Sequence, residues 1–123
     1  MSDTNTPELL DQARAREVRD LMRDAGAGAY QTMIDNLERD LAKYTLLLQT
    51  HTDGAPMEDV RRVAHSLKGG SRAMGARALG ELFATLEQHA KAGDINTARH
   101  LHEASGAAIA SSMAALRELN ANV

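Results

Sequence analysis

Apolar residues recur every three or four positions along most of the chain, and no stretch shows the strict alternation of a half-buried strand. Alanine, leucine, glutamate and arginine, which all favour helices, dominate the composition, and the 123 residues include two prolines. The sequence therefore predicts an all-α fold.

The apolar periodicity divides into five segments that are separated by turn signals. Breaks that contain glycine lie at positions 26–28, 75 and 93, and the run 52–56 is a further turn. Asp94 is the expected N-cap of the last segment. The predicted helices span about 7–23, 29–50, 57–74, 76–92 and 95–119.

Short connections make sequential helices pack side by side. We therefore expect the last four helices to form an antiparallel up-and-down four-helix bundle over residues 29–121. Residues 1–25 would add an accessory N-terminal helix across one end of this bundle. At this length, residues 1–123 are expected to form a single domain.

Composition limits the possible functions. The absence of cysteine excludes disulfides and thiolate metal sites. A formal net charge of −3 gives no basic footprint, and two tyrosines with one phenylalanine offer few rings for stacking bases, so we expect no nucleic-acid partner. The first residues lack a signal-peptide pattern, and no stretch approaches the roughly 20 apolar residues of a membrane span. We expect a cytoplasmic protein without a membrane partner.

The third predicted helix carries four basic or titratable residues at spacings of four, three and four, so they share one outward face. They are Arg61, His65, Lys68 and Arg72. A histidine beside an apolar stripe is often structural. Here, however, Lys68 lies one turn away and supplies a compact cation that suits a phosphoryl group.

Two adjacent glycines follow this lysine. Gly69 and Gly70 each cost a helix interior about 1 kcal/mol relative to alanine, so something should compensate for them. Close packing of two helices is one explanation. The other is room for a second protein to bring a bulky group against the imidazole.

Gly75 relates His65 to the fourth predicted helix. His65 lies ten residues before this turn and Glu87 twelve after it. At roughly 1.5 Å per residue, both therefore lie at similar heights on adjacent helices. A Glu87 carboxylate that accepts the Nδ1 hydrogen would fix the tautomer and leave Nε2 as the nucleophile. The alternative is a solvated Glu87 that pairs with Lys91 at i+4.

The run His65-Ser66-Leu67-Lys68-Gly69-Gly70, with Gly75 and Leu79 downstream, resembles the H-x-x-K-G pattern of histidine-containing phosphotransfer (HPt) domains. The similarity covers about residues 29–119. It implies a helical bundle in which His65 accepts the phosphoryl group, Lys68 is its charge partner and Gly69 gives partners access. It also implies that Glu87 bonds the ring, with Lys91 as a second basic residue, and Arg72 is a further candidate for the phosphate environment.

The resemblance implies a phosphoryl carrier and not an enzyme. No metal or cofactor is expected on this chain, because the partner receiver domain would supply Mg²⁺. The expected partners are receiver domains of response regulators or a hybrid histidine kinase, met by a monomer through a transient interface. Leu21, Met22 and Met33 are candidates for its apolar part, while Arg61 and Arg62 are expected to be solvated or to lie at its rim.

Two other functions remain open at this point. One is a non-phosphorylated helical module that docks on a receiver or kinase as an inhibitor. The other is a detached phosphoacceptor domain fed by a separate chemotaxis-type kinase core, since no segment here could form an ATP-binding domain. The remaining histidines are expected to be surface or boundary residues that do not form a metal site: His51, His89, His100 and His102.

Overall fold

The computed structural model describes residues 8–26, 28–51 and 57–121. All regular secondary structure within these ranges is helical, which confirms the predicted all-α class. The predicted turn at 52–56 and the start of the first predicted helix at Pro7 lie outside the described residues. The helices are α1 (Gln12–Ala25), α2 (Ala29–Thr50), α3 (Glu58–Ala73), α4 (Arg77–Lys91), α5 (Ile95–Ala104) and α6 (Gly106–Ala121).

Local sequence signals set several helix ends. Asp11 caps α1 by accepting the backbone N–H of Arg14 at 3.2 Å, so this helix begins later than the periodicity alone predicts. Asp94 caps α5 as predicted and accepts the backbone N–H of Thr97 at 3.3 Å. Gly75 ends α3 in the left-handed region at φ +75°, which a glycine adopts without strain.

The prediction of one helix over 95–119 is wrong, because the segment divides into α5 and α6 at Ser105. The Ser105 N–H donates to the carbonyl oxygens of Leu101 and His102 at 3.0 and 3.2 Å, which closes α5. The next helix starts at Gly106, a residue type with low helix propensity. The break lets α5 pack on α4 while α6 contacts α1, α2 and α4.

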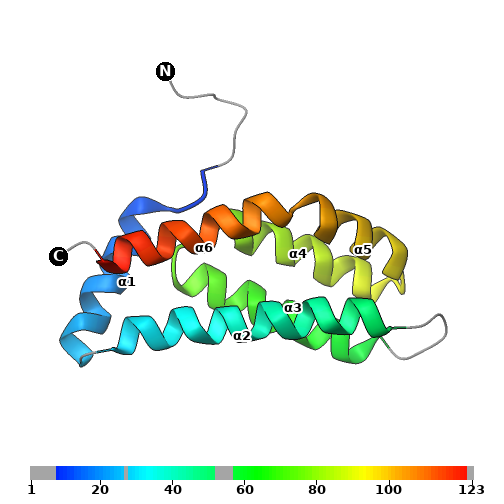
Figure 1. Cartoon of the computed structure of the whole chain (residues 1–123), viewed down its shortest axis with the longest axis horizontal. Coiled ribbons are helices and arrows are strands. Elements are labelled where there is room, and N and C mark those ends of the chain that lie inside the picture. The colour runs from blue at the N-terminus through cyan, green and yellow to red at the C-terminus, as the bar shows by residue number, and fades with distance from the viewer. Residues whose placement is uncertain (1–7, 27, 52–56, 122–123) are drawn as a thin grey trace, which may run out of the picture.

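The longest helices lie side by side along the long axis of the molecule (Figure 1). Helix α3 packs mainly against α4 and secondarily against α2. The core between the helices includes an edge-to-face pair of Tyr44 and Phe83, whose ring centroids are 5.3 Å apart. Other fully buried side chains in this core are Ile34, Leu67, Leu79, Leu86 and Leu116.

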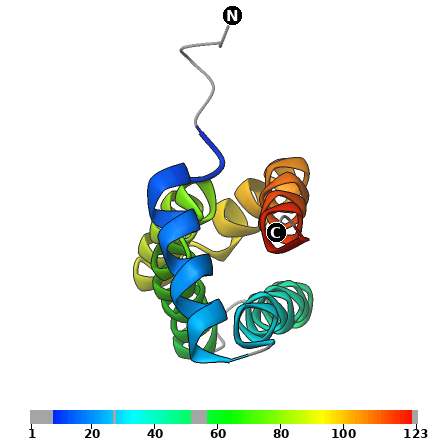
Figure 2. The ribbon, with the colours of Figure 1, turned by 90° about the vertical axis from the view of Figure 1, so that its left-hand side faces the viewer.

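Helix α1 lies across one end of the molecule (Figure 2). The Asp11 N–H donates to the Gly75 carbonyl at 2.8 Å, and the Ala78 N–H donates to the Leu9 carbonyl at 3.2 Å. The two backbones approach so closely that a Cβ on Gly75 would lie 2.7 Å from the Ala15 nitrogen. The segment around α1 is therefore fastened to the turn between α3 and α4.

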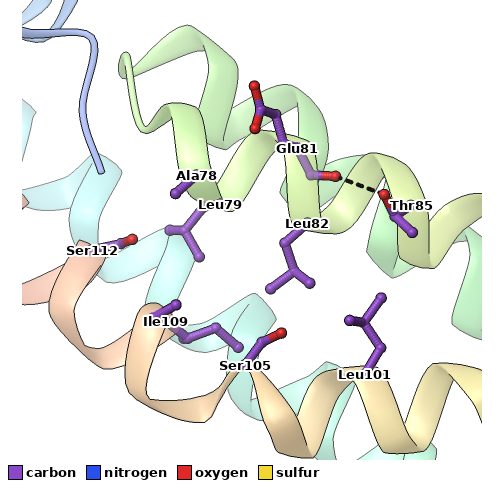
Figure 3. A pocket seen from close by; sticks show the side chains of 10 residues that line it. Ala78, Leu79, Glu81, Leu82, Thr85, Leu101, Ser105, Ile109 and Ser112 are labelled. Atoms are coloured by element: carbon purple, nitrogen blue, oxygen red, sulfur yellow. Dashed lines mark hydrogen bonds between the residues drawn. The ribbon is translucent and has the colours of Figure 1, made fainter. Parts of the chain in front are cut away.

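An apolar groove of about 310 Å³ runs between α4 and the α5–α6 pair (Figure 3). We call it the α4–α6 groove; it is lined by Ala78, Leu79, Glu81, Leu82, Thr85, Leu101, Ser105, Ala108, Ile109 and Ser112. At about 100° per residue, Ala78 lies on the opposite side of α4 from Glu87.

In the part of the chain that the structure describes, no helix is long and apolar enough to cross a membrane.

Candidate functional site

His65 projects from α3, a helix that is anchored in the core. Its neighbours Ala64 and Leu67 are fully buried in the core, whereas the His65 side chain is 63% exposed. The helix therefore presents the ring to solvent while its own apolar stripe anchors it.

Glu87 on α4 reaches the buried side of this ring. Its side chain is 2% exposed, and its Oε2 lies 2.8 Å from Nδ1 of His65. A carboxylate can only accept in this contact, so Nδ1 carries the hydrogen, and in the neutral ring Nε2 is the nitrogen with the free lone pair. The hydrogen bond expected from the positions of both residues relative to Gly75 is thus present, and Glu87 is not the solvated residue of the alternative.

Neighbouring cations keep the buried Glu87 carboxylate ionised. Its pKa lies below the ordinary value, chiefly because the Lys68 ammonium donates to it; burial works in the opposite direction, and the His65 hydrogen bond adds to the lowering. The carboxylate is therefore a stable acceptor for the Nδ1 hydrogen near neutral pH.

Lys68 lies on the expected face but has a partner that the sequence did not indicate. Its Nζ donates to Glu87 Oε1 at 2.6 Å, and its side chain is mostly buried. The ammonium expected to neutralise a phosphoryl group is thus bonded to the carboxylate that holds the histidine ring. Lysine is a flexible point charge, so this position does not prevent it from reaching toward an added group.

The two glycines of α3 divide between the two explanations left open by the sequence. A Cβ on Gly69 would meet nothing within 4 Å, so this position faces open space beside His65. A Cβ on Gly70 would lie 3.2 Å from Cδ2 of Leu37, which is the close approach of α3 to α2. Packing explains Gly70, whereas access fits Gly69.

The remaining predicted basic residues are not equivalent. Lys91 Nζ lies 3.9 Å from Glu87 Oε2 and is half exposed. Arg72 makes no ion pair within the described ranges, and its Cγ would lie 2.9 Å from a Cβ on Gly80, so its stem passes over that glycine. The structure therefore brings Lys91, but not Arg72, to the Glu87 carboxylate.

Arg61 is the residue whose place the sequence reasoning missed. It was expected at the rim or in solvent, yet its Nη1 lies 3.8 Å from Glu87 Oε2. Two other nitrogens of the guanidinium bond Glu58: Nε at 3.0 Å and Nη2 at 2.5 Å. Its position four residues before His65, on the same helical face, was the available signal.

A groove of about 270 Å³ lies between α2 and α3. Met33 and Ser66 both line it, and Ser66 donates to Asp40 at 3.2 Å. Of the other apolar docking candidates, Leu21 is largely exposed and Met22 is half-buried against the core. Met33 therefore shares a groove with Ser66, the residue that follows His65 on α3.

The other histidines make separate contacts. The His102 ring packs on Tyr44 at 5.4 Å between centroids, and burial lowers its pKa. His89 Nδ1 lies 3.9 Å from Asp94 Oδ2, and His100 is exposed. Across the described residues, no group of three or more potential metal ligands gathers.

A family model described as the Hpt domain matches residues 28–119. The match covers most of the chain, so this protein belongs to the Hpt domain family, as the motif around His65 predicted. Comparisons with curated proteins and with solved structures give no match. Membership of the family implies a phosphotransfer role in two-component signalling, in which Hpt domains interact with receiver domains and kinases.

Proposed function

We propose that this protein is a phosphoryl carrier that accepts a phosphoryl group on Nε2 of His65 and passes it to or from aspartates of receiver domains. The observation that carries the proposal is the exposed His65 ring whose Nδ1 is held by a buried, ionised Glu87 at 2.8 Å. Such a ring has a defined tautomer, with its nucleophilic nitrogen directed away from the carboxylate.

In the transfer step, the Nε2 lone pair attacks the phosphorus of an aspartyl phosphate on the partner. The P–N bond forms as the P–O bond to the aspartate breaks, and the electron pair of the broken bond remains on the aspartate carboxylate. Nδ1 keeps its hydrogen, so the ring becomes an imidazolium whose charge Glu87 balances. The reverse step returns the group to a second receiver.

Within this proposal, each neighbour of His65 has a separate role. Lys68 neutralises part of the charge of about −1.5 to −2 that a phosphoryl group adds, taking phosphorylated hydroxyls as a guide. The open space at Gly69 admits the partner's surface, and Lys91 and Arg72 extend the positive charge around it. Mg²⁺ comes from the receiver, so the chain acts as a carrier and not as an enzyme.

We further propose that α2, α3, α4 and the α5–α6 pair form one antiparallel up-and-down bundle with α1 as its accessory helix. The contacts of α3 with α2 and α4, and of α6 with α1, α2 and α4, support this arrangement. A single bundle that presents one histidine face fits a monomer with a modest, transient docking interface.

The proposal is tested by incubating the chain with a panel of receiver domains that carry a labelled acyl phosphate. We expect acid-labile, base-stable label on the wild type and none on His65→Gln, which should keep its fold and its docking. Label on both proteins, or on neither in the presence of every receiver, contradicts a receiver-fed carrier. Label obtained only with a kinase core would favour the detached acceptor, and inhibition that is unchanged in His65→Gln would favour the docking module.

A further inference from the structure

The Glu87 carboxylate has more cations around it than it bonds. Lys68 Nζ and His65 Nδ1 lie at 2.6 and 2.8 Å, while Arg61 Nη1 and Lys91 Nζ lie at 3.8 and 3.9 Å. Among the described residues these are the charged or titratable groups that face it, three from α3 and one from its own helix. Two of them are close but are not yet hydrogen-bonded.

Phosphorylation gives Lys68 a second anion to bind. The phosphoryl group would be attached to Nε2, on the opposite side of the ring from the Nδ1 that Glu87 holds. Its charge exceeds that of one carboxylate and it is more accessible to the flexible ammonium. Under the proposed function, the phosphoryl group therefore draws Lys68 away from Glu87.

The departure of Lys68 would leave Glu87 in a costly position. The carboxylate is 2% exposed, and the Lys68 hydrogen bond is the largest contribution to its ionisation. A buried carboxylate that loses its counter-ion tends to take up a proton. A neutral Glu87 would no longer balance the imidazolium that phosphorylation creates.

Arg61 is placed to prevent the protonation of Glu87. Glu58 binds its Nε and Nη2, so the guanidinium is anchored while its third nitrogen, Nη1, is the one nearest to Glu87. A movement of about 1 Å would bring Nη1 to hydrogen-bond distance. We propose that Arg61 is a positioning residue that replaces Lys68 as the counter-ion of Glu87 in the phosphorylated protein, an inference that rests on the proposed function.

Arg61 fits this role better than Lys91. The Lys91 side chain is 49% exposed and makes no other ion pair in the described part of the chain, so nothing fixes its ammonium near the carboxylate. The Arg61 side chain is 31% exposed and is tethered by two hydrogen bonds to one partner. An anchored planar fork loses less freedom when it forms one more hydrogen bond.

The proposal can be tested without phosphorylation by removing the Lys68 charge. We would titrate the Glu87 carboxyl carbon by ¹³C NMR in the wild type, in Lys68→Met, and in Lys68→Met combined with Arg61→Met or Arg62→Met. Arg62 is the matched control, because it is the next residue and approaches Glu58 at 4.0 Å without contacting Glu87.

We expect Lys68→Met to raise the proton affinity of Glu87 by less than about tenfold, because Arg61 closes on the carboxylate. Adding Arg61→Met should raise it by at least about another tenfold, whereas adding Arg62→Met should not. Adding Arg61→Lys should give an intermediate increase, because lysine keeps the charge but loses the planar fork that Glu58 anchors. Equal effects of the two arginine substitutions would overturn the proposal. Far-UV circular dichroism and the urea midpoint confirm that each variant is folded. If a variant does not fold, it is made again with Lys68→Gln in place of Lys68→Met.

The phosphorylated form provides the second arm. Phosphoramidate serves as the donor: its P–N bond breaks and ammonia leaves with a proton from solvent as the P–N bond to His65 forms. In phosphorylated Arg61→Met, Glu87 should bind its proton at least about tenfold more tightly than in phosphorylated wild type or Arg62→Met; no difference overturns the proposal. If ³¹P NMR shows no phosphohistidine in the wild type, the carrier function fails, while the unphosphorylated titrations still decide whether Arg61 becomes the counter-ion of Glu87 when the Lys68 charge is removed.

Discussion

Helix α4 faces two very different surroundings. Toward α3 it presents Glu87, a buried carboxylate with cations of α3 at 2.6 and 3.8 Å. We call this region the His65 face, comprising Arg61, His65, Lys68, Gly69 and Glu87. Toward α5 and α6 the same helix lines the α4–α6 groove, whose lining is mainly apolar, with hydroxyl groups from Thr85, Ser105 and Ser112 and the carboxylate of Glu81 (Figure 3).

The two regions differ in whether their buried polar groups have partners. The groove contains Ser112, which is fully buried and whose hydroxyl finds no partner within the described ranges. A neutral hydroxyl can be left this way at modest cost, but a carboxylate cannot. Glu87, the buried charged residue of α4, therefore lies where α3 supplies counter-ions, so changes on the two sides should have separable effects.

The largest effect is expected for Phe83→Ala in the apolar core between α4 and α2. Phe83 is fully buried and packs edge-to-face on Tyr44, so its removal leaves a cavity. We expect a loss of about 3–5 kcal/mol in the free energy of unfolding, measured by urea denaturation. Below its transition, the variant should take up phosphate normally on His65; a selective loss of phosphorylation in the folded variant would mean that core packing at Phe83 and the His65 face are not separable.

Gly69→Leu should weaken receiver docking by roughly thirtyfold, or about 2 kcal/mol, because the side chain fills the open space beside His65. Stability should not fall, since nothing lies within 4 Å of the added Cβ and leucine favours the helix. Isothermal titration with a receiver domain measures the docking. Gly69→Ala is the control and should dock nearly as well as the wild type; equal loss in both variants would argue against a steric role.

Glu87→Gln should slow phosphoryl uptake by His65 by about tenfold, because the amide holds the ring without balancing its charge. It should also change acid stability. The folded Glu87 has a lowered pKa, so its contribution is present above the ordinary carboxyl pKa and is lost as the pH falls through the lower folded value. Urea midpoints at several pH values should show the wild type losing its advantage over Glu87→Gln in acid; a constant difference would count against this ionised contact.

The smallest effect is expected for Ser112→Ala on the groove side. Its buried hydroxyl has no partner, so removing it should leave stability unchanged or raise it by up to about 1 kcal/mol. Thermal unfolding followed by circular dichroism measures this. A clear loss of stability would mean that the hydroxyl is paired, and any loss of phosphorylation would link the two sides of α4.

The sequence predicted the helical class and the meeting of His65 with Glu87 for simple geometric reasons. Both residues lie on helices with a constant rise, and the turn at Gly75 is short, so counting residues from it places them at one height. The break at Ser105 could not be read in the same way. The apolar stripe continues across it, and Gly106 lowers helix propensity without by itself forbidding a helix.

The partner of Lys68 and the place of Arg61 also escaped the sequence. Both side chains are long, and their several rotatable bonds allow more than one carboxylate within reach. Their positions depend on the burial of Glu87, which follows from how α3 and α4 pack and not from the residues around the motif alone. The pattern thus predicts which backbone positions share a face, while the choice among charged partners is made by tertiary packing.

The clasp between α1 and the α3–α4 turn affects how this module can be transplanted. The family match begins at residue 28, yet the Gly75 carbonyl accepts from Asp11, and Ala15 covers the Gly75 backbone. A graft that starts at the family boundary would expose this turn to water and remove the Asp11 N–H from the Gly75 carbonyl, which also accepts from the Arg77 N–H at 3.0 Å. A graft should therefore include the chain from residue 8 onward. The segment needed for a stable graft is longer than the segment that the family model matches.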